Sequence, residues 1–156
     1  MRSMDTLLTA LDTAIWELGE AFTDMPDADL WTRPHPKLLS VGELGGHIGY
    51  GLNKWMALGE IESPLNEDEL RYYPYTLEQP TQVALTSDEM YAEIKRVHEL
   101  CKAAFAERNP SADDKHPVRE EFTWGAALEY QVFHVAYHTG QIYSVRHLLG
   151  HETVDN

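Results

Sequence analysis

Two histidines near the C-terminal end of the chain have the spacing of metal ligands. His134 and His138 are four residues apart, so on a helix both imidazoles lie on one face, about one turn apart. Two such imidazoles can bind one metal ion, since Zn–N bonds are about 2.0–2.1 Å long. Both also fall on the core-facing line of the expected helix, where Leu or Ile is usual. Buried imidazole nitrogens need partners; a metal ion would provide them, and hydrogen bonds to neighbouring helices are the alternative.

Three further polar residues are candidates for the same site. His47 lies one turn after Glu43 on a second expected helix. Glu43 could orient His47 or complete a coordination shell, because carboxylates commonly hold ligating histidines; the alternative role of Glu43 is to cap its helix. Gln141, one turn past His138, could orient a ligand in the same way. The sequence contains no HExxH, Glu-x-x-His, paired-cysteine or G-x-S-x-G motif, which leaves these residues as the main candidates for chemistry.

Four segments with helical periodicity must position these residues. Apolar side chains recur every three or four positions in each of them, and the expected helices span approximately residues 4–23, 40–62, 86–108 and 124–150. Ser40 with Glu43, and Thr86 with Glu89, have the spacing of a capping box. The link 63–85 is long enough for a crossover between helices that are not adjacent. The sequence therefore predicts an all-α four-helix bundle, with residues 1–156 forming a single domain.

The second expected helix is unusually rich in glycine, and its five glycines are Gly42, Gly45, Gly46, Gly49 and Gly51. Each glycine inside a helix costs roughly 1 kcal/mol relative to alanine. We therefore expect something to approach this side of the helix closely. Tight packing of a neighbouring helix is the preferred explanation; a second subunit, a ligand, or room for Trp and Tyr rings are the others.

Composition excludes several classes of function. The chain of 156 residues is 43% hydrophobic, which is enough for a core without disulfides, and its single cysteine, Cys101, lies on an apolar stripe and is expected in that core. A net charge of −14 without a basic cluster argues against nucleic-acid binding. No apolar run approaches the roughly 20 residues that span a bilayer, and the N-terminus lacks a signal-peptide pattern. We expect a cytoplasmic protein that binds neither nucleic acid nor membrane.

Two stretches resemble motifs of a known family. Residues 40–48, SVGELGGHI, resemble the second-helix motif of the DinB-like family, also called YfiT-like metal-dependent hydrolases, and residues 123–130 and 134–142 resemble its fourth-helix motif. The resemblance implies an up-down-down-up bundle and a homodimer. It also implies one divalent metal ion per chain, nickel or zinc, held by His47, His134 and His138.

The resemblance also implies a chemistry. Characterised members include thiol-dependent S-transferases and a mycothiol-dependent isomerase. We therefore expect an enzyme of S-transferase or hydrolase type that acts on a small molecule, whose metal activates a low-molecular-weight thiol or water, with Glu43 and Gln141 supporting the ligands. Thr139 stands where many relatives carry Arg, so no particular substrate carries over. The alternatives are a non-catalytic or stress-responsive bundle with a structural metal, and a metal-free bundle with core histidines.

Overall fold

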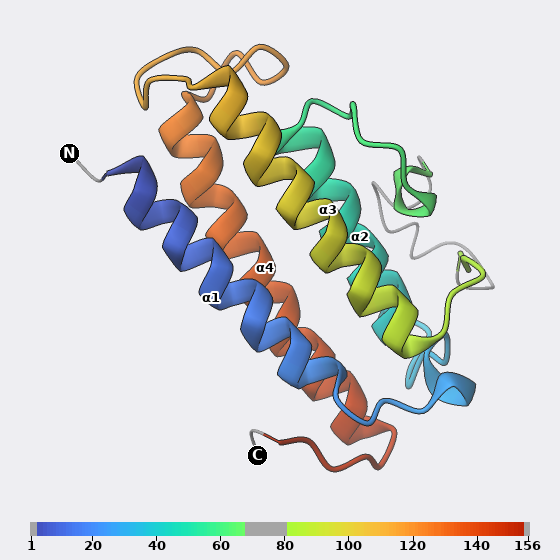
Figure 1. The fold of residues 1–156 in the computed structure, drawn as a ribbon. Coiled ribbons are helices and arrows are strands. Elements are labelled where there is room, and N and C mark those ends of the chain that lie inside the picture. The colour runs from blue at the N-terminus through green and yellow to red at the C-terminus, as the bar shows by residue number, and fades with distance from the viewer. Residues whose placement is uncertain (1–2, 68–80, 155–156) are drawn as a thin grey trace.

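Four long helices lie side by side in the computed structural model, which describes residues 3–67 and 81–154 (Figure 1). Within these ranges no β-strand forms, so the expectation of an all-α protein is confirmed. The helices are α1 (Met4–Phe22), α2 (Val41–Met56), α3 (Ser87–Arg108) and α4 (Trp124–Leu148), with short 3-10 turns η1 (Asp27–Asp29) and η2 (Pro64–Asn66).

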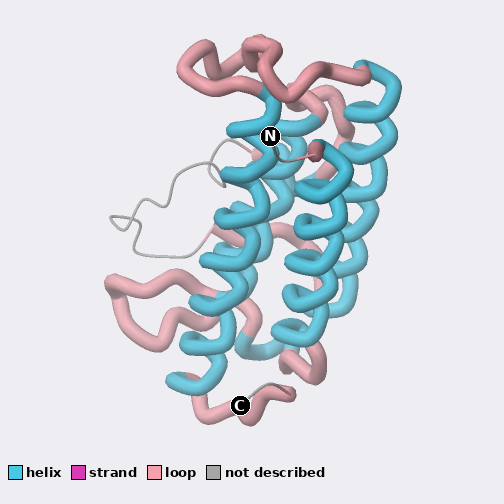
Figure 2. The backbone as a smooth tube through the Cα atoms, turned by 90° about the vertical axis from the view of Figure 1, so that its left-hand side faces the viewer, coloured by secondary structure: helices cyan, strands magenta, loops and turns pink. Residues whose placement is uncertain are grey.

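The helices follow the up-down-down-up order. α1 and α4 run in one direction, and α2 and α3 run in the other (Figure 1). Because α2 and α3 are parallel, the chain between them must return along the bundle, which explains the length of the 63–85 link; its residues 68–80 lie outside the described part. α1 packs on α3 and α4, and α2 packs on the same two helices. Figure 2 shows the N-terminal and C-terminal residues at opposite ends of the bundle.

Both expected capping boxes form. The Ser40 side chain accepts a hydrogen bond from the backbone N–H of Glu43, and the Glu43 carboxylate accepts one from the backbone N–H of Ser40. Thr86 and Glu89 make the same reciprocal pair at the start of α3. Each box satisfies backbone donors that a helix start leaves unpaired, so these two helices begin within one residue of the expected positions.

The end of α2 differs from the expectation. The helix stops at Met56 and not near residue 62, because the next residues turn the chain back. Leu58 (φ 58°) and Gly59 (φ 83°) take left-handed conformations that end a helix. The Asn53 side chain then holds the returning chain: it donates to the carbonyl of Ile61 at 2.7 Å and accepts from the Ile61 N–H at 3.2 Å.

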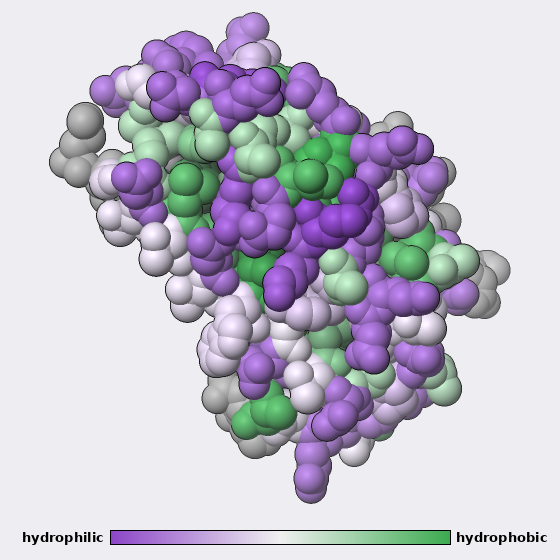
Figure 3. Space-filling model, viewed as in Figure 1, coloured by the Kyte–Doolittle hydropathy of each residue, from purple (hydrophilic) through white to green (hydrophobic). Residues whose placement is uncertain are grey.

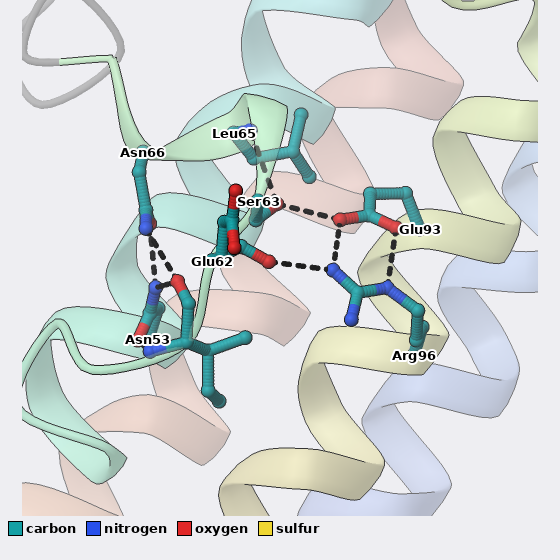
Figure 4. Close-up of polar contacts among 8 residues, drawn as sticks. Asn53, Glu62, Ser63, Leu65, Asn66, Glu93 and Arg96 are labelled. Carbon is teal, nitrogen blue, oxygen red and sulfur yellow. Dashed lines mark hydrogen bonds and ion pairs between the residues drawn. The ribbon is translucent and has the colours of Figure 1, made fainter.

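A polar network fixes the segment that follows. The Ser63 hydroxyl donates to Glu93 of α3 at 2.7 Å, and Glu93 in turn accepts from Arg96 at 2.7 Å (Figure 4). This arrangement holds the fully buried Leu65 against α2. A Cβ atom added at Gly49 would lie 2.4 Å from Leu65 Cδ1, so the glycine provides the space that Leu65 fills.

The other described α2 glycines have the same explanation. A Cβ added at Gly42 would lie 2.7 Å from the ring of Trp31, and one at Gly45 would lie 2.8 Å from the ring of Phe22. The nearest atoms belong to side chains in each case. Neighbouring segments therefore approach these positions closely through their side chains, and at Gly45 those side chains come from the neighbouring helices α1 and α3.

The core and the surface separate as expected for a bundle. Apolar side chains from all four helices form one buried cluster, while the outer faces of α1 and α3 are mostly hydrophilic (Figure 3). No helix in the described part is both long and apolar enough to cross a membrane. The last turn of α4 departs from apolar burial: Leu148 is 63% exposed, and Arg146 is buried in the core instead.

Candidate metal centre

α2 and α4 bring three histidine rings to one point inside the bundle. His47 comes from α2, and His134 and His138 come from α4. One nitrogen of each ring lies within 4.8 Å of the others. The ring centroids are 4.6–5.0 Å apart, with interplanar angles of 65–87°. The three rings that the sequence singled out therefore form a compact group of nitrogen donors.

The closest nitrogens lie at hydrogen-bond distance. Nε2 of His134 and Nε2 of His47 are 2.8 Å apart, close enough to share one proton. Two nitrogen ligands of a tetrahedral zinc ion lie about 3.3 Å apart, as follows from Zn–N bonds of about 2.0–2.1 Å. A small outward movement of either ring would reach that spacing. His134 and His138 are buried whereas His47 is partly exposed, so solvent reaches the group at His47.

The surroundings keep the two α4 imidazoles neutral. Burial and, to a smaller extent, charge repulsion from His47 and His138 together lower the pKa of His134 to about 3. Burial also lowers the pKa of His138, against a smaller opposing effect of its hydrogen bond to Gln141. A metal ion binds the neutral imidazole, so the cluster holds its nitrogens in the state that coordination needs.

Gln141 fixes the orientation of one ring. Its Oε1 lies 2.6 Å from Nδ1 of His138, so Nδ1–H donates to Gln141 and Nε2 keeps its lone pair. This is the usual arrangement around a ligating histidine. The Gln141 side-chain N–H also donates to the Tyr137 hydroxyl at 3.4 Å. The structure thus brings Gln141 to the histidine group, as the sequence predicts.

Glu43 lies at the start of α2 and is engaged there. Its Oε2 accepts hydrogen bonds from the Ser40 N–H, the Ser40 hydroxyl and Arg33 Nε, each at 2.9 Å, and its Oε1 pairs with the other end of the Arg33 guanidinium. The group of potential ligands among the described residues contains the three histidines and not Glu43. Of the three roles expected for Glu43, the structure shows the helix cap.

The sequence analysis did not identify a second glutamine beside the histidines, Gln131, as a site residue. Gln131 is fully buried one turn before His134, and its amide atoms and Nδ1 of His134 have no hydrogen-bond partner among the described residues. A Cβ added at Gly51 would lie 2.9 Å from the His134 ring and 3.7 Å from Gln131 Oε1. The symmetric spacing Gln-x2-His-x3-His-x2-Gln over residues 131–141 is the sequence pattern that could have identified Gln131.

The remaining reactive side chains have structural roles. Asp12, His98 and Glu99 also cluster, but the ammonium of Lys102 already pairs with Asp12 at 2.8 Å and Glu99 at 3.1 Å. An added cation would have to displace it. Cys101 is buried in the core as expected, and burial raises the pKa of its thiol to about 12, which makes it a poor nucleophile.

Comparison with known proteins identified two matches. A model of the DinB superfamily matches residues 10–142. The crystal structure of a conserved protein from Enterococcus faecalis superposes with a TM-score of 0.63 at 20% sequence identity, covering 97% of this chain and 99% of that one. At this identity the likeness shows the fold alone. Comparison with curated protein sequences found no match.

Proposed function

Because the chain belongs to the DinB superfamily, we propose that His47, His134 and His138 bind one divalent metal ion and that the protein is a metal-dependent enzyme. The observation that carries the proposal is the convergence of three ring nitrogens within 4.8 Å. Imidazole donors suit nickel and zinc, the two ions that the family resemblance implies. When bound, such an ion lowers the pKa of a water or small thiol and so supplies a nucleophile at neutral pH.

The residues around the cluster favour an open site over a closed structural one. Glu43 is engaged by Ser40 and Arg33, so the described residues offer three protein ligands and not four. Catalytic zinc sites have three protein ligands, whereas structural sites have four. His47 is partly exposed, which gives a small molecule access to the cluster. We therefore favour a thiol S-transferase or hydrolase over a bundle with a structural metal.

The metal content of two proteins tests the site. Untagged wild-type protein and the His138→Ala variant are purified in parallel and analysed for transition metals. We expect about one ion per chain in the wild type and a loss of more than tenfold in the variant. Circular dichroism of both proteins controls for folding. Equal metal content in the two folded proteins, or none in either, would contradict the proposal.

The reaction needs a separate test. Metal-loaded protein is incubated with small thiols and electrophiles, or with ester and amide substrates, and turnover is compared with that of His138→Ala. Metal binding without turnover by any of them would favour the structural alternative. The homodimer and the small-molecule substrate stay predictions.

The Gln141 side chain gives a second prediction. Gln141→Leu removes the acceptor for Nδ1–H of His138, so we expect metal affinity to fall about 10- to 100-fold, as is typical when the partner of a ligating histidine is lost. Competition against a chelator measures the dissociation constant. Gln141→Glu, which keeps an acceptor oxygen, is the matched control and should retain most of the affinity. Equal affinity of Gln141→Leu and the wild type would show that Gln141 does not support the site.

A further inference from the structure

A small cavity opens about one helical turn from the histidine group. It has a volume of about 160 Å³ and lies between the start of α2 and the C-terminal half of α4. Leu44, which lines it, precedes His47 by three residues on α2, and Gln141, which also lines it, follows His138 by three residues on α4. Both helices therefore place the cavity about one turn away from the three histidines.

The cavity is apolar and of a defined size. Its inner wall comes from the buried side chains of Leu39, Leu44 and Val145, while Leu38 and Leu148 border it with exposed fractions of 38% and 63%. An apolar cavity of about 150 Å³ accommodates benzene. The cavity can thus take one ring or a short branched alkyl group.

A single positively charged side chain at the cavity indicates the chemistry of the ligand that the cavity would bind. Among the described residues that line the cavity, Lys37 is the only charged one, and Gln141 and Ser144 are the only polar neutral ones. The chain as a whole carries a net charge of −14, so a lone ammonium beside an apolar cavity contrasts with its surroundings. Charge complementarity favours a carboxylate or similar anionic group next to the ring.

Much of the exposed apolar surface lies near this cavity. Among the described residues, five of the nine exposed large hydrophobic side chains border the cavity or lie along the same face of α4. Three of the five are the aromatic residues Tyr130, Phe133 and Tyr137, which contact one another in sequence, and Tyr137 also contacts the ring of His138. These rings extend the apolar surface along α4 as far as His138, about one turn before Gln141 at the cavity.

We propose that this cavity binds the apolar body of a small carboxylate, an aryl or short alkyl acid, whose reactive end reaches the three histidines. The binding site is inferred from the geometry of the cavity, whereas the role of the bound molecule as a substrate rests on the proposed function. Seven residues of α4 separate His138 from Val145, a rise of about 10 Å, so the molecule must be about that long. Gln141, which contacts both the cavity and His138, links the two sites.

Titration of the metal-free protein tests the cavity alone. 3-Phenylpropionate and its amide, which has the same shape without the charge, are added separately to 15N-labelled protein. We expect saturable shifts in the amide signals of residues 37–44 and 141–148, and at least several-fold tighter binding of the acid than of the amide. Lys37→Gln should remove this preference. Absence of saturable binding, or an equal preference in Lys37→Gln, would overturn the proposal.

A variant that fills the cavity tests where the acid binds. Ser144 is exposed on α4, so Ser144→Trp can place a ring in the cavity without disturbing the core and should weaken binding at least tenfold, whereas Ser144→Ala should not. Unchanged affinity in folded Ser144→Trp would place the ligand elsewhere and refute the assignment. All of these titrations use the metal-free protein. Failure of the metal site would leave this result intact, so the two proposals fail separately.

Discussion

Replacing Arg146 with methionine is expected to destabilise the protein by roughly 3 kcal/mol. Arg146 extends from α4 to the end of α1, where its guanidinium donates to the carbonyls of Ala21 at 2.7 Å and Thr23 at 2.8 Å, and it also donates to the carbonyl of Glu152 at 3.2 Å. The carbonyls at a helix end carry a partial negative charge that a cation stabilises. Methionine would leave these acceptors without their partner in a region where Arg146 itself is 1% exposed.

The size of the effect reflects two opposing contributions. Burial lowers the pKa of Arg146, which shows that the charged side chain loses solvation here, and methionine would recover that loss. Each buried acceptor left unpaired costs about 1–3 kcal/mol, and three acceptors outweigh the recovered solvation. At 2–4 °C per kcal/mol for a domain of this size, the melting temperature should fall by about 6–12 °C.

Thermal unfolding followed by circular dichroism measures this change. Arg119→Met is the matched control, since the Arg119 side chain is 42% exposed and its ion pair with Glu121 spans 3.6 Å. An exposed pair of this kind contributes at most about 1 kcal/mol. Equal melting temperatures for the two variants would mean that Arg146 does not hold α1 and α4 together.

The sequence predicted the features that depend on local spacing. Apolar periodicity located four helices, and the capping-box patterns at Ser40 and Thr86 located two helix starts, because a capping box forms within four consecutive residues. The four-residue spacing of His134 and His138 likewise follows from one helix, and the structure brings them together. His47 needed the family resemblance, since nothing in its own helix indicates which residues face it.

Features that depend on contacts between distant segments could not be predicted. The end of α2 is set by Asn53 holding the returning backbone of Ile61, and no local signal distinguishes this asparagine from any other. Arg146 is buried because the end of α1 supplies carbonyl partners from more than 120 residues away, so an arginine next to an apolar line looks like a surface residue. The α2 glycines correctly predicted that other atoms approach this helix closely. The approaching side chains belong to other segments, so the sequence of α2 could not identify them.

Removal of the metal should give the second large effect, a fall in melting temperature of about 8–16 °C. A ligand that binds only the folded state stabilises it by about 4.1 kcal/mol when its free concentration is 1,000 times the dissociation constant, and each kcal/mol is worth about 2–4 °C here. The three ligands lie on two helices that pack against each other. The unfolded chain cannot hold His47 close to the other two, so the binding energy becomes folding energy.

The measurement compares the wild type with excess nickel or zinc and with EDTA, alongside His138→Ala under both conditions. We expect the variant to melt at the same temperature with and without metal, because it retains only two of the three ring nitrogens. The variant is compared with itself under the two conditions, because loss of the buried His138 ring and of its hydrogen bond to Gln141 lowers the melting temperature even without metal. A metal-dependent shift of similar size in the variant would mean that the ion binds elsewhere. No shift in the wild type would mean that the three histidines form a hydrogen-bonded core cluster without a metal.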